Sequence, residues 1–495
     1  MTRSHNFPSE LSSVEELGSQ LDEKMITHQD LFSACLDSMN ETARDYGHIL
    51  FTDEDALDKR GANKTASKDV KRRSLLDGIP ILIKDNIDTS DMPTTAGSTI
   101  LAQLEPPKRD ASIVSILRNS GAVIAGKTNL SEWSNFRGLN SISGWSGVGG
   151  QCKNAVDPTR SPGGSSSGSA VAVALGVVRV AIGTETDGSL MCPAAFNGVV
   201  ALKPTHGLIS TEGVVPIAKS QDTVGPIGRS VLDVASAFIT MSLSNDPFAL
   251  LDSIKSYAQR SFTDLKRPKV AVATDSLFGY HQATDAIIYD AIETLNKRLE
   301  VVMECDKGKT NSLKVSDDLE YEVLISEFAF GIERYMSTRI TTTGRSLEWL
   351  VSENEKEKHR ELVLFGQELF EDALTRRDDL SSPRYLQALT SNRSNARKKL
   401  SRAFAYHDVD VIVAPTTSPS PLIDDRVGDF HLGSGYSIAA VGGYPSLTLP
   451  AGYVNDLPVG LLLIGKPYKE IQLLSIAAVM EDMLSFQLKP KMTPL

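Results

Sequence analysis

The sequence predicts an α/β protein in which helices cover both faces of one large β-sheet. Short apolar runs typical of buried strands alternate with helical segments from about residue 79 to residue 240. Similar apolar runs return at Val409–Pro415 and Ser446–Pro450, and we expect them to join the same sheet. A chain of 495 residues can hold two or three domains, but large α/β enzymes of this length also fold as one. We therefore expect a single domain over residues 1–495.

The first part of the chain predicts two helices and then a buried strand. The helices fall within residues 13–46, and Ser13 and Thr27 each begin a helix-capping pair. The aliphatic run Ile79–Ile83 is typical of a buried strand, and Lys84 ends it. The carboxyl ends of strands are where α/β enzymes usually place their chemistry. Taken alone, however, such a lysine is usually a solvated strand-end residue.

Small residues dominate the segment before the next predicted strand. Gly163–Ser169 consists of glycines and serines only, and a helix of small residues is expected over Ser166–Gly176. The apolar run Val178–Ile182 predicts a strand that leads into the turn Thr184–Ser189. Glycines let the backbone approach a ligand closely, and serine hydroxyls can attack a carbonyl or relay protons. The serine at this strand-to-turn junction, Ser189, lies beside backbone N–H groups, which is the arrangement that acyl transfer requires.

A serine nucleophile needs a base, and the sequence offers two candidates. Among the eight histidines, only His206 lies near small turn residues, and its surroundings do not favour a base. Burial of Lys84 at the end of its strand would shift its amine toward the neutral form, which accepts a proton. Lys84 is therefore the preferred base.

Together these motifs resemble the amidase signature family of amidohydrolases. They stand in the family's order, densely from about residue 75 to 240 and again from about 405 to 485, and weakly between. An ordered set of separate motifs is far more specific than any one of them. The resemblance rests on Ile79–Lys84, Pro162–Ala170, Gly183–Ser189, Pro193–Ala195, Gly198–Thr205, Asp222–Pro226 and Pro458–Gly465.

The resemblance implies a fold and a set of site residues. The implied fold is a three-layer α/β/α arrangement with a large mixed central sheet. The implied catalytic residues are Ser189 as nucleophile, Lys84 as base and Ser165 as a relay that follows a cis peptide bond from Gly164. The implied oxyanion hole consists of backbone N–H groups of Thr186, Asp187, Gly188 and Ser189 itself. The resemblance implies neither a cofactor nor a metal.

Two positions depart from the broad family pattern. Asp187 stands where much of the family has glycine, and Met191 stands where it has arginine. Asp187 offers the same backbone N–H, so we expect the oxyanion hole to survive while the side chain changes the rim of the pocket. The sequence Thr186–Ser189 looks more like the peptide-amidase branch, which removes ammonia from C-terminal peptide amides. It looks less like the subunit that serves glutaminyl-tRNA amidotransferases.

Three other features near these motifs are not expected to have the role that their pattern or residue type suggests. Gly121–Thr128 matches the phosphate-loop pattern, but its middle is an apolar strand where a phosphate cradle needs a flexible loop. Gly121 itself is expected to end the preceding helix. Gly164–Gly168 matches the nucleophile-elbow pattern, but the polar residues 154–162 precede it in place of a strand. Cys192 is expected to line the site without being the nucleophile.

Residues 245–400 are interpreted as a variable helical segment. Charge density rises there, and no catalytic motif is found. Two roles stay open for this segment: it covers the cleft and selects the substrate, or it is a helical insertion without a role in the site.

Composition limits the compartment and the partners. The net charge of −11 argues against nucleic acid or an anionic membrane as a partner. The expected partner is a small-molecule or peptide amide substrate, and the expected state is a monomer or homodimer. Four scattered cysteines indicate free thiols in a reducing compartment. The first twelve residues are polar, and no apolar run is long enough to span a membrane, so we expect a cytoplasmic location.

The leading hypothesis is an amidohydrolase that cleaves a carboxamide to a carboxylate and ammonia or an amine through an acyl-enzyme on Ser189. Two alternatives stay open. One is a subunit of the amidotransferase A type that supplies ammonia within a complex, and the other is a catalytically silent binding scaffold. The presence of Lys84 and both serines argues against the scaffold. Peptide, aryl, fatty and small aliphatic amides all remain candidate substrates.

Overall fold

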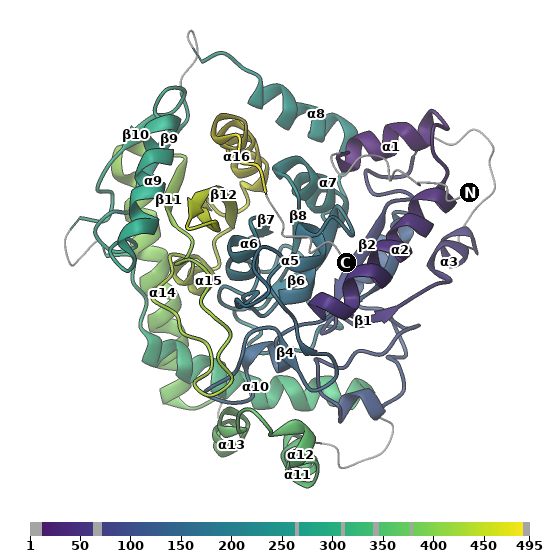
Figure 1. The fold of residues 1–495 in the computed structure, drawn as a ribbon. Coiled ribbons are helices and arrows are strands. Elements are labelled where there is room, and N and C mark those ends of the chain that lie inside the picture. Colours follow the sequence, from purple (N-terminus) through teal and green to yellow (C-terminus); the bar gives the residue numbers. More distant parts are fainter. Residues whose placement is uncertain are drawn as a thin grey trace.

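A computed structural model describes residues 12–62, 72–262, 267–307, 312–339, 346–376 and 380–488. Within these ranges eleven strands form one sheet, in the order β1-β3-β2-β6-β8-β7-β12-β13-β11-β9-β10 (Figure 1). The expectation about the polar start of the chain falls almost wholly on residues 1–11, outside the described residues. No helix in the described ranges is long and apolar enough to cross a membrane.

The strands are short except for the hairpin β12–β13. Their bounds are β1 Ile49–Thr52, β2 Pro80–Lys84, β3 Val123–Thr128, β6 Val180–Glu185, β7 Val200–Lys203, β8 Thr223–Gly228, β9 Lys269–Val272, β10 Glu300–Val302, β11 Val411–Pro415, β12 Ser446–Val454 and β13 Leu457–Gly465. A separate two-stranded sheet consists of β4 Trp145–Ser146 and β5 Gly150–Gln151.

The large sheet is mixed, as the family resemblance implied. Strands β3, β2 and β6 run parallel near one edge, and β11, β9 and β10 run parallel at the other. Between these two groups the pairs β6–β8, β8–β7, β7–β12, β12–β13 and β13–β11 are antiparallel. The parallel group β3–β2–β6 contains the strand that ends in Lys84.

Helices cover both faces of the sheet, which confirms the three-layer prediction (Figure 1). Alternation along the strands produces two apolar faces: in β13, Leu462 and Ile464 join one hydrophobic cluster, while Leu461 and Leu463 join another. The first face is covered by α2 His28–Tyr46, α5 Ser167–Ala174, α6 Met191–Asn197, α14 Pro383–Ala405 and α15 Ser437–Gly442. The second face is covered by α1 Val14–Asp22, α4 Ser112–Asn119, α7 Val231–Met241, α8 Pro247–Ala258, α9 Gln282–Leu295 and α16 Glu470–Leu484.

A third group of helices packs against loops near the end of the sheet where β2 and β6 finish. It comprises α10 Asp317–Arg339, α11 Leu347–Lys356, α12 Lys358–Glu361 and α13 Glu368–Thr375, which lie together at the bottom of Figure 1. These helices bury Trp133, Phe136 and Ile217 in one cluster. The buried guanidinium of Arg137 donates to the carbonyls of Phe365 and Gly366 at 3.2 and 3.0 Å, which ties this group to the loop that follows β3.

The remaining helices are short: α3 Ala56–Ala62, and the 3₁₀ turns η1 Leu101–Gln103, η2 Glu132–Asn135 and η3 Tyr406–Asp408. Most predicted elements are present, with three differences. The strand predicted at Val178–Ile182 begins at Val180 and continues to Glu185, so it includes part of the predicted turn. The strand predicted to end at Pro450 runs on to Val454 past a bulge between Pro450 and Gly452.

The third difference concerns residues 245–400, which are not only helical. Strands β9 and β10 lie in this segment and complete one edge of the main sheet. They are four and three residues long, and β10 is partly exposed. Runs this short carry too little alternation for a strand to be recognised from the sequence.

Candidate active site

The end of strand β2 places Lys84 beside strand β6. The two strands are parallel neighbours, with Leu82 opposite Ala181 and Ile83 opposite Ile182. Because parallel strands finish at the same edge of a sheet, the side chains at their carboxyl ends meet. Lys84 Nζ lies 2.8 Å from Thr184 Oγ1.

The serine loop brings a second hydroxyl to the same amine. Lys84 Nζ lies 2.7 Å from Ser165 Oγ, and both side chains are fully buried. The peptide bond between Gly164 and Ser165 is cis, as the family resemblance implied. The loop is held in place by Ser131, whose backbone N–H donates to the Ser165 carbonyl at 3.1 Å. The predicted contact between base and relay is therefore present.

The third predicted residue, Ser189, lies on the same small hollow as Ser165. The backbone N–H of Ser166 donates to the Ser189 carbonyl at 3.1 Å, which joins the serine loop to the turn after β6. Thr184 and Thr186 also line this hollow. The fold thus gathers Lys84, Ser165 and Ser189 from three separate segments of the chain.

The surroundings of Lys84 favour an uncharged amine. Burial lowers the pKa of Lys84 to about 7, against the raising effect of the charges on Asp222 and Glu185. The two atoms that it contacts are neutral hydroxyl oxygens. Asn86 Nδ2 donates to Thr184 Oγ1 at 3.0 Å and so orients one of them. An amine with this pKa is substantially unprotonated at neutral pH and can accept a proton.

Buried carboxylates fix the turn that carries Ser189. Glu185 Oε2 accepts hydrogen bonds from the backbone N–H groups of Leu190 and Met191 at 2.8 and 3.0 Å. Gly188 has a φ of +78°, and a Cβ at this position would meet the ring of Tyr436 at 2.2 Å. Only glycine satisfies both conditions.

Asp222 anchors the other side of this turn. Its Oδ1 accepts from the hydroxyl of Thr186 at 2.6 Å, and its Oδ2 accepts from the backbone N–H groups of Ile217 and Ala218 at 3.0 and 3.1 Å. Burial raises the pKa of Asp222 to about 7. Asp222 therefore connects the turn that carries Ser189 to the loop that faces helix α10.

Ser189 opens onto a cleft with a volume of about 440 Å³. Its walls include Thr186, Asp187, Cys192 and Tyr436, which lie in the two parts of the chain where the family resemblance is dense. Helices α10 and α13 add Tyr321, Leu324 and Leu369. The segment without catalytic motifs thus contributes to the walls of the cleft, which favours the first of the two roles left open for it.

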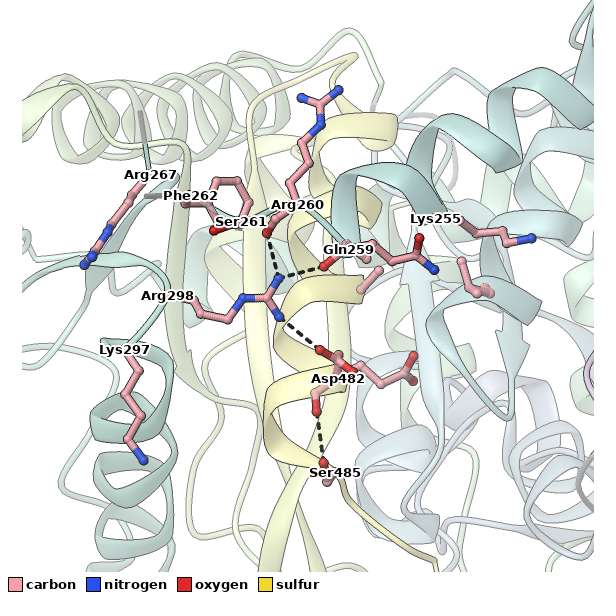
Figure 2. A pocket seen from close by; sticks show the side chains of 14 residues that line it. Lys255, Gln259, Arg260, Ser261, Phe262, Arg267, Lys297, Arg298, Asp482 and Ser485 are labelled. Atoms are coloured by element: carbon pink, nitrogen blue, oxygen red, sulfur yellow. Dashed lines mark hydrogen bonds and ion pairs between the residues drawn. The ribbon is translucent and has the colours of Figure 1, made fainter. Parts of the chain in front are cut away.

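A larger hollow of about 860 Å³ lies elsewhere, between the ends of α8, α9 and α16 (Figure 2). It is rich in arginine and lysine, but the guanidinium of Arg298 is already bound to Asp482 and to the carbonyls of Ala258 and Arg260. None of the residues predicted for the site lines this hollow. The smaller cleft is therefore the candidate active site.

The residues set aside at the sequence level take structural places. Cys192 lines the cleft, and burial raises the pKa of its thiol to about 12, so the thiolate nucleophile is scarce. His206 lies away from the cleft, with its Nδ1 3.1 Å from Arg393 Nη2 and its Nε2 2.9 Å from the Lys219 carbonyl. The phosphate-loop match is strand β3, and Gly121 follows helix α4 with a φ of +87°.

Sequence reasoning missed four supporting residues: Asn86, Thr184, Glu185 and Asp222. All four lie inside motifs that carried the family resemblance or directly beside them. The sequence did contain one indication of these residues: polar side chains lie at or near the ends of two predicted strands. Without the sheet order, nothing in the sequence showed that Asn86 and Thr184 lie next to each other.

Comparisons with known proteins show which proteins this chain resembles. The family described as Amidase matches residues 30–474. A probable amidase of Arabidopsis thaliana is 32% identical, over 99% of this chain and 93% of its own length. The A subunit of the glutamyl-tRNA(Gln) amidotransferase of Methanospirillum hungatei is 32% identical, over 82% of this chain and 93% of its own length. The structure of native peptide amidase from Stenotrophomonas maltophilia is 36% identical and has a TM-score of 0.88, covering 98% of this chain and 100% of that chain.

Proposed function

Because the chain belongs to the amidase signature family, we propose that Ser189, Ser165 and Lys84 are its nucleophile, proton relay and base. The chain is an amidase, a hydrolase of the carboxamide C–N bond. One observation carries the proposed roles: Lys84 Nζ and Ser165 Oγ lie 2.7 Å apart and are fully buried, and Ser165 lines the same hollow as Ser189.

In the proposed mechanism, protons move from Ser189 through Ser165 to Lys84 and are later returned to the leaving group. Neutral Lys84 takes the hydroxyl proton of Ser165, and Ser165 takes the hydroxyl proton of Ser189. Ser189 Oγ attacks the carbonyl carbon and forms a tetrahedral intermediate. The proton returns through Ser165 to the leaving nitrogen as the C–N bond breaks, which leaves an ester on Ser189. Water then hydrolyses this ester by the same proton path and releases the carboxylate.

The backbone of the turn supplies the proposed oxyanion hole. The N–H groups of Thr186, Asp187 and Gly188 precede the nucleophile, and one such donor typically stabilises the transition state by about 3–4 kcal/mol. The Gly188 N–H also interacts with the buried Glu185 carboxylate. We therefore expect Thr186 and Asp187 to contribute most of the stabilisation.

Peptides with a C-terminal carboxamide are the proposed substrates. The support is the similarity to peptide amidase over 98% of the chain and a cleft lined by Phe136, Tyr321, Leu324 and Tyr436. Apolar and aromatic walls of this kind suit peptide side chains. The continuous sheet supports one catalytic domain over residues 1–495, and four buried free cysteines support a cytoplasmic location.

Active-site labelling tests the proposed nucleophile. A phosphonofluoridate should add one phosphonyl group to Ser189, located by peptide mass mapping, and a peptide amide should slow the labelling. Ser189→Ala should lose both labelling and ammonia release while keeping the wild-type unfolding transition. Ser210→Ala, at an exposed loop serine, should keep both. Labelling at another residue, or turnover by Ser189→Ala, would show that the roles are wrong.

The amidotransferase relative favours a second candidate function, in which the chain supplies ammonia within a complex. Under the leading proposal the purified chain alone releases ammonia from peptide amides. Under the alternative, ammonia release appears only after partner proteins are added. The same ammonia assay on the lone chain separates the two functions.

A further inference from the structure

The cleft beside Ser189 is lined by acidic side chains without a matching cation. The described residues that line this cleft include no lysine and no arginine. Two aspartates line it, Asp187 and Asp429. His431 also lines it, and its Nε2 lies 3.8 Å from Asp429 Oδ2. A substrate carboxylate entering this cleft would therefore meet no lysine or arginine with which to pair.

Asp187 lies beside a second carboxyl group. Its side chain interacts with the hydroxyl of Ser437 and with the carboxyl of Glu320, which helix α10 contributes. Glu320 is 7% exposed. Two buried carboxyl groups this close favour a proton on one of them. The other carboxyl can then keep a negative charge next to the turn that carries Ser189.

Gln221 joins this carboxyl pair to the reacting centre. Its Nε2 donates to Glu320 Oε1 at 2.8 Å and to the carbonyl of Thr186 at 3.3 Å. Asp187 Oδ1 is buried and has no hydrogen-bond partner among the described residues. A buried carboxylate oxygen that lacks a donor disfavours another anion nearby.

The position of Asp187 places the charge of the carboxyl pair close to the reacting centre. Asp187 lies two residues before Ser189, and its backbone N–H belongs to the proposed oxyanion hole. Burial raises the pKa of both carboxyls, that of Glu320 to about 7, and the charge of Glu320 adds to the rise at Asp187. Above that pH the pair bears negative charge in a site of low polarity, where charges act more strongly than in water.

Building on the proposed function, we propose that Asp187, positioned by Glu320, selects amide substrates by charge. The cleft accepts amides whose acyl portion is uncharged or cationic, and it rejects acyl portions that carry a carboxylate. Asp187 is the specificity-determining residue in this proposal, and Glu320 is a positioning residue that acts through it.

A matched set of substrates tests the selection at about pH 8. The anionic member is Nα-acetyl-glutamate α-amide, and its γ-methyl ester is the neutral member of nearly equal size. Nα-acetyl-lysinamide and Nα-acetyl-norleucinamide form the cationic and neutral pair. We expect kcat/KM for the ester to exceed that for the acid by at least about tenfold. We expect lysinamide to be hydrolysed at least as well as norleucinamide.

Two variants and a control assign the selection to the carboxyl pair. Asp187→Asn should reduce the ester-to-acid ratio of kcat/KM at least about fivefold, and Glu320→Gln should reduce it less. Asp318→Asn removes an exposed carboxylate from the same helix and should leave the ratio unchanged.

The outcomes separate this inference from the proposed function. Hydrolysis of the neutral amides with an ester-to-acid ratio near one in the wild type overturns the charge selection alone. An unchanged ratio in both Asp187→Asn and Glu320→Gln also overturns it. Absence of ammonia from every neutral amide overturns the proposed function and the charge selection together.

Discussion

Two lysines on neighbouring strands are equally buried, but their amines contact different groups. Lys84 ends β2 and Lys127 lies near the end of β3, and neither side chain is exposed to solvent. The strands are parallel, with Ile83 opposite Lys127 and Lys84 opposite Thr128. Successive residues of a strand point to opposite faces, so the two amines enter different surroundings although their strands pair directly.

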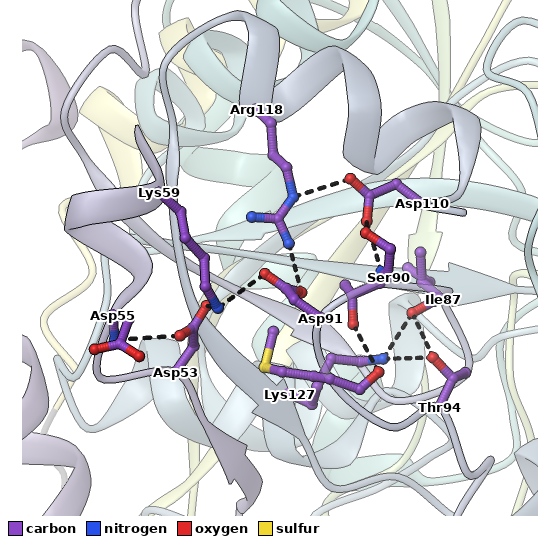
Figure 3. Close-up of polar contacts among 12 residues, drawn as sticks. Asp53, Asp55, Lys59, Ile87, Ser90, Asp91, Thr94, Asp110, Arg118 and Lys127 are labelled. Atoms are coloured by element: carbon purple, nitrogen blue, oxygen red, sulfur yellow. Dashed lines mark hydrogen bonds and ion pairs between the residues drawn. The ribbon is translucent and has the colours of Figure 1, made fainter. Parts of the chain in front are cut away.

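Lys127 is surrounded by acceptors, one of them charged. Its Nζ donates to the carbonyl of Ile87 at 2.7 Å and to Thr94 Oγ1 at 2.9 Å, as Figure 3 shows. It also forms an ion pair with the buried Asp85 at 3.3 Å. Burial lowers the pKa of Lys127, but the charges on Asp85 and Asp88 oppose this effect.

Lys84, by contrast, contacts two hydroxyl oxygens and, among the described residues, no carboxylate. Burial alone therefore does not make a lysine a base. A carboxylate beside a buried lysine opposes loss of the lysine's proton, whereas a lysine that contacts only hydroxyls can exchange a proton with them. We therefore expect Lys84 and Lys127 to differ in function because their amines contact different groups.

The largest expected effect comes from removing the amine of Lys84. Lys84→Met keeps the aliphatic stem and should lower kcat by roughly 10³–10⁴-fold, since the relay then has no proton acceptor. The folded state should survive, because the partners left behind are neutral hydroxyls that can bond to each other or to water. Ammonia release and guanidinium unfolding, measured on the same preparation, check both statements. Activity within tenfold of wild type would remove Lys84 from the mechanism.

The same change at the second lysine should affect stability. Lys127→Met leaves the buried Asp85 without its cation, which typically costs about 3–5 kcal/mol of unfolding free energy. The kcat of the molecules that remain folded should stay within severalfold of wild type. Equilibrium unfolding in guanidinium measures the unfolding free energy. Active-site titration with a phosphonofluoridate gives the concentration of folded enzyme, by which kcat is corrected. An unchanged unfolding midpoint would show that the two lysines do not differ as described.

The pH dependence should report the neutral form of Lys84. Because only the unprotonated amine accepts a proton, kcat/KM should fall about tenfold per pH unit below an apparent pKa of about 7 and level off above it. The measurement is the pH profile of kcat/KM for a neutral peptide amide between about pH 5.5 and 9. The pH profile of the Lys127→Met variant is the control. A profile that is flat over this range would contradict a lysine base.

The smallest effect is expected at the hydroxyl that assists Lys84. Thr184→Val keeps the shape of the side chain but removes an oxygen 2.8 Å from Lys84 Nζ. Loss of this acceptor disfavours the charged amine, so the apparent pKa of kcat/KM should fall by up to about one pH unit and kcat should fall less than about tenfold. An apparent pKa that rises would mean that Thr184 does not stabilise the charged form of Lys84.

Local patterns in the sequence were sufficient for the central elements of the fold. The aliphatic run before Lys84, the small residues after Gly163 and the apolar run before Thr184 predicted β2, α5 and β6 with small errors at their ends. The short strands β9 and β10 were missed. Pairing of β9 with β11 and of β10 with β9, and not a pattern of their own, makes them strands.

The identity of the proposed reacting groups follows from the resemblance of the chain's motifs to the amidase signature family. Lys84, Ser165 and Ser189 stand in motifs whose order and spacing indicate an amidase, and the structure brings these three residues to one site. The groups that surround them depend on how the chain folds. Asn86 and Thr184 meet because β2 and β6 are neighbours in the sheet, and Glu320 reaches Asp187 because α10 packs over the cleft. Contacts between distant segments depend on sheet order and helix packing, which the whole chain determines together and no local pattern encodes.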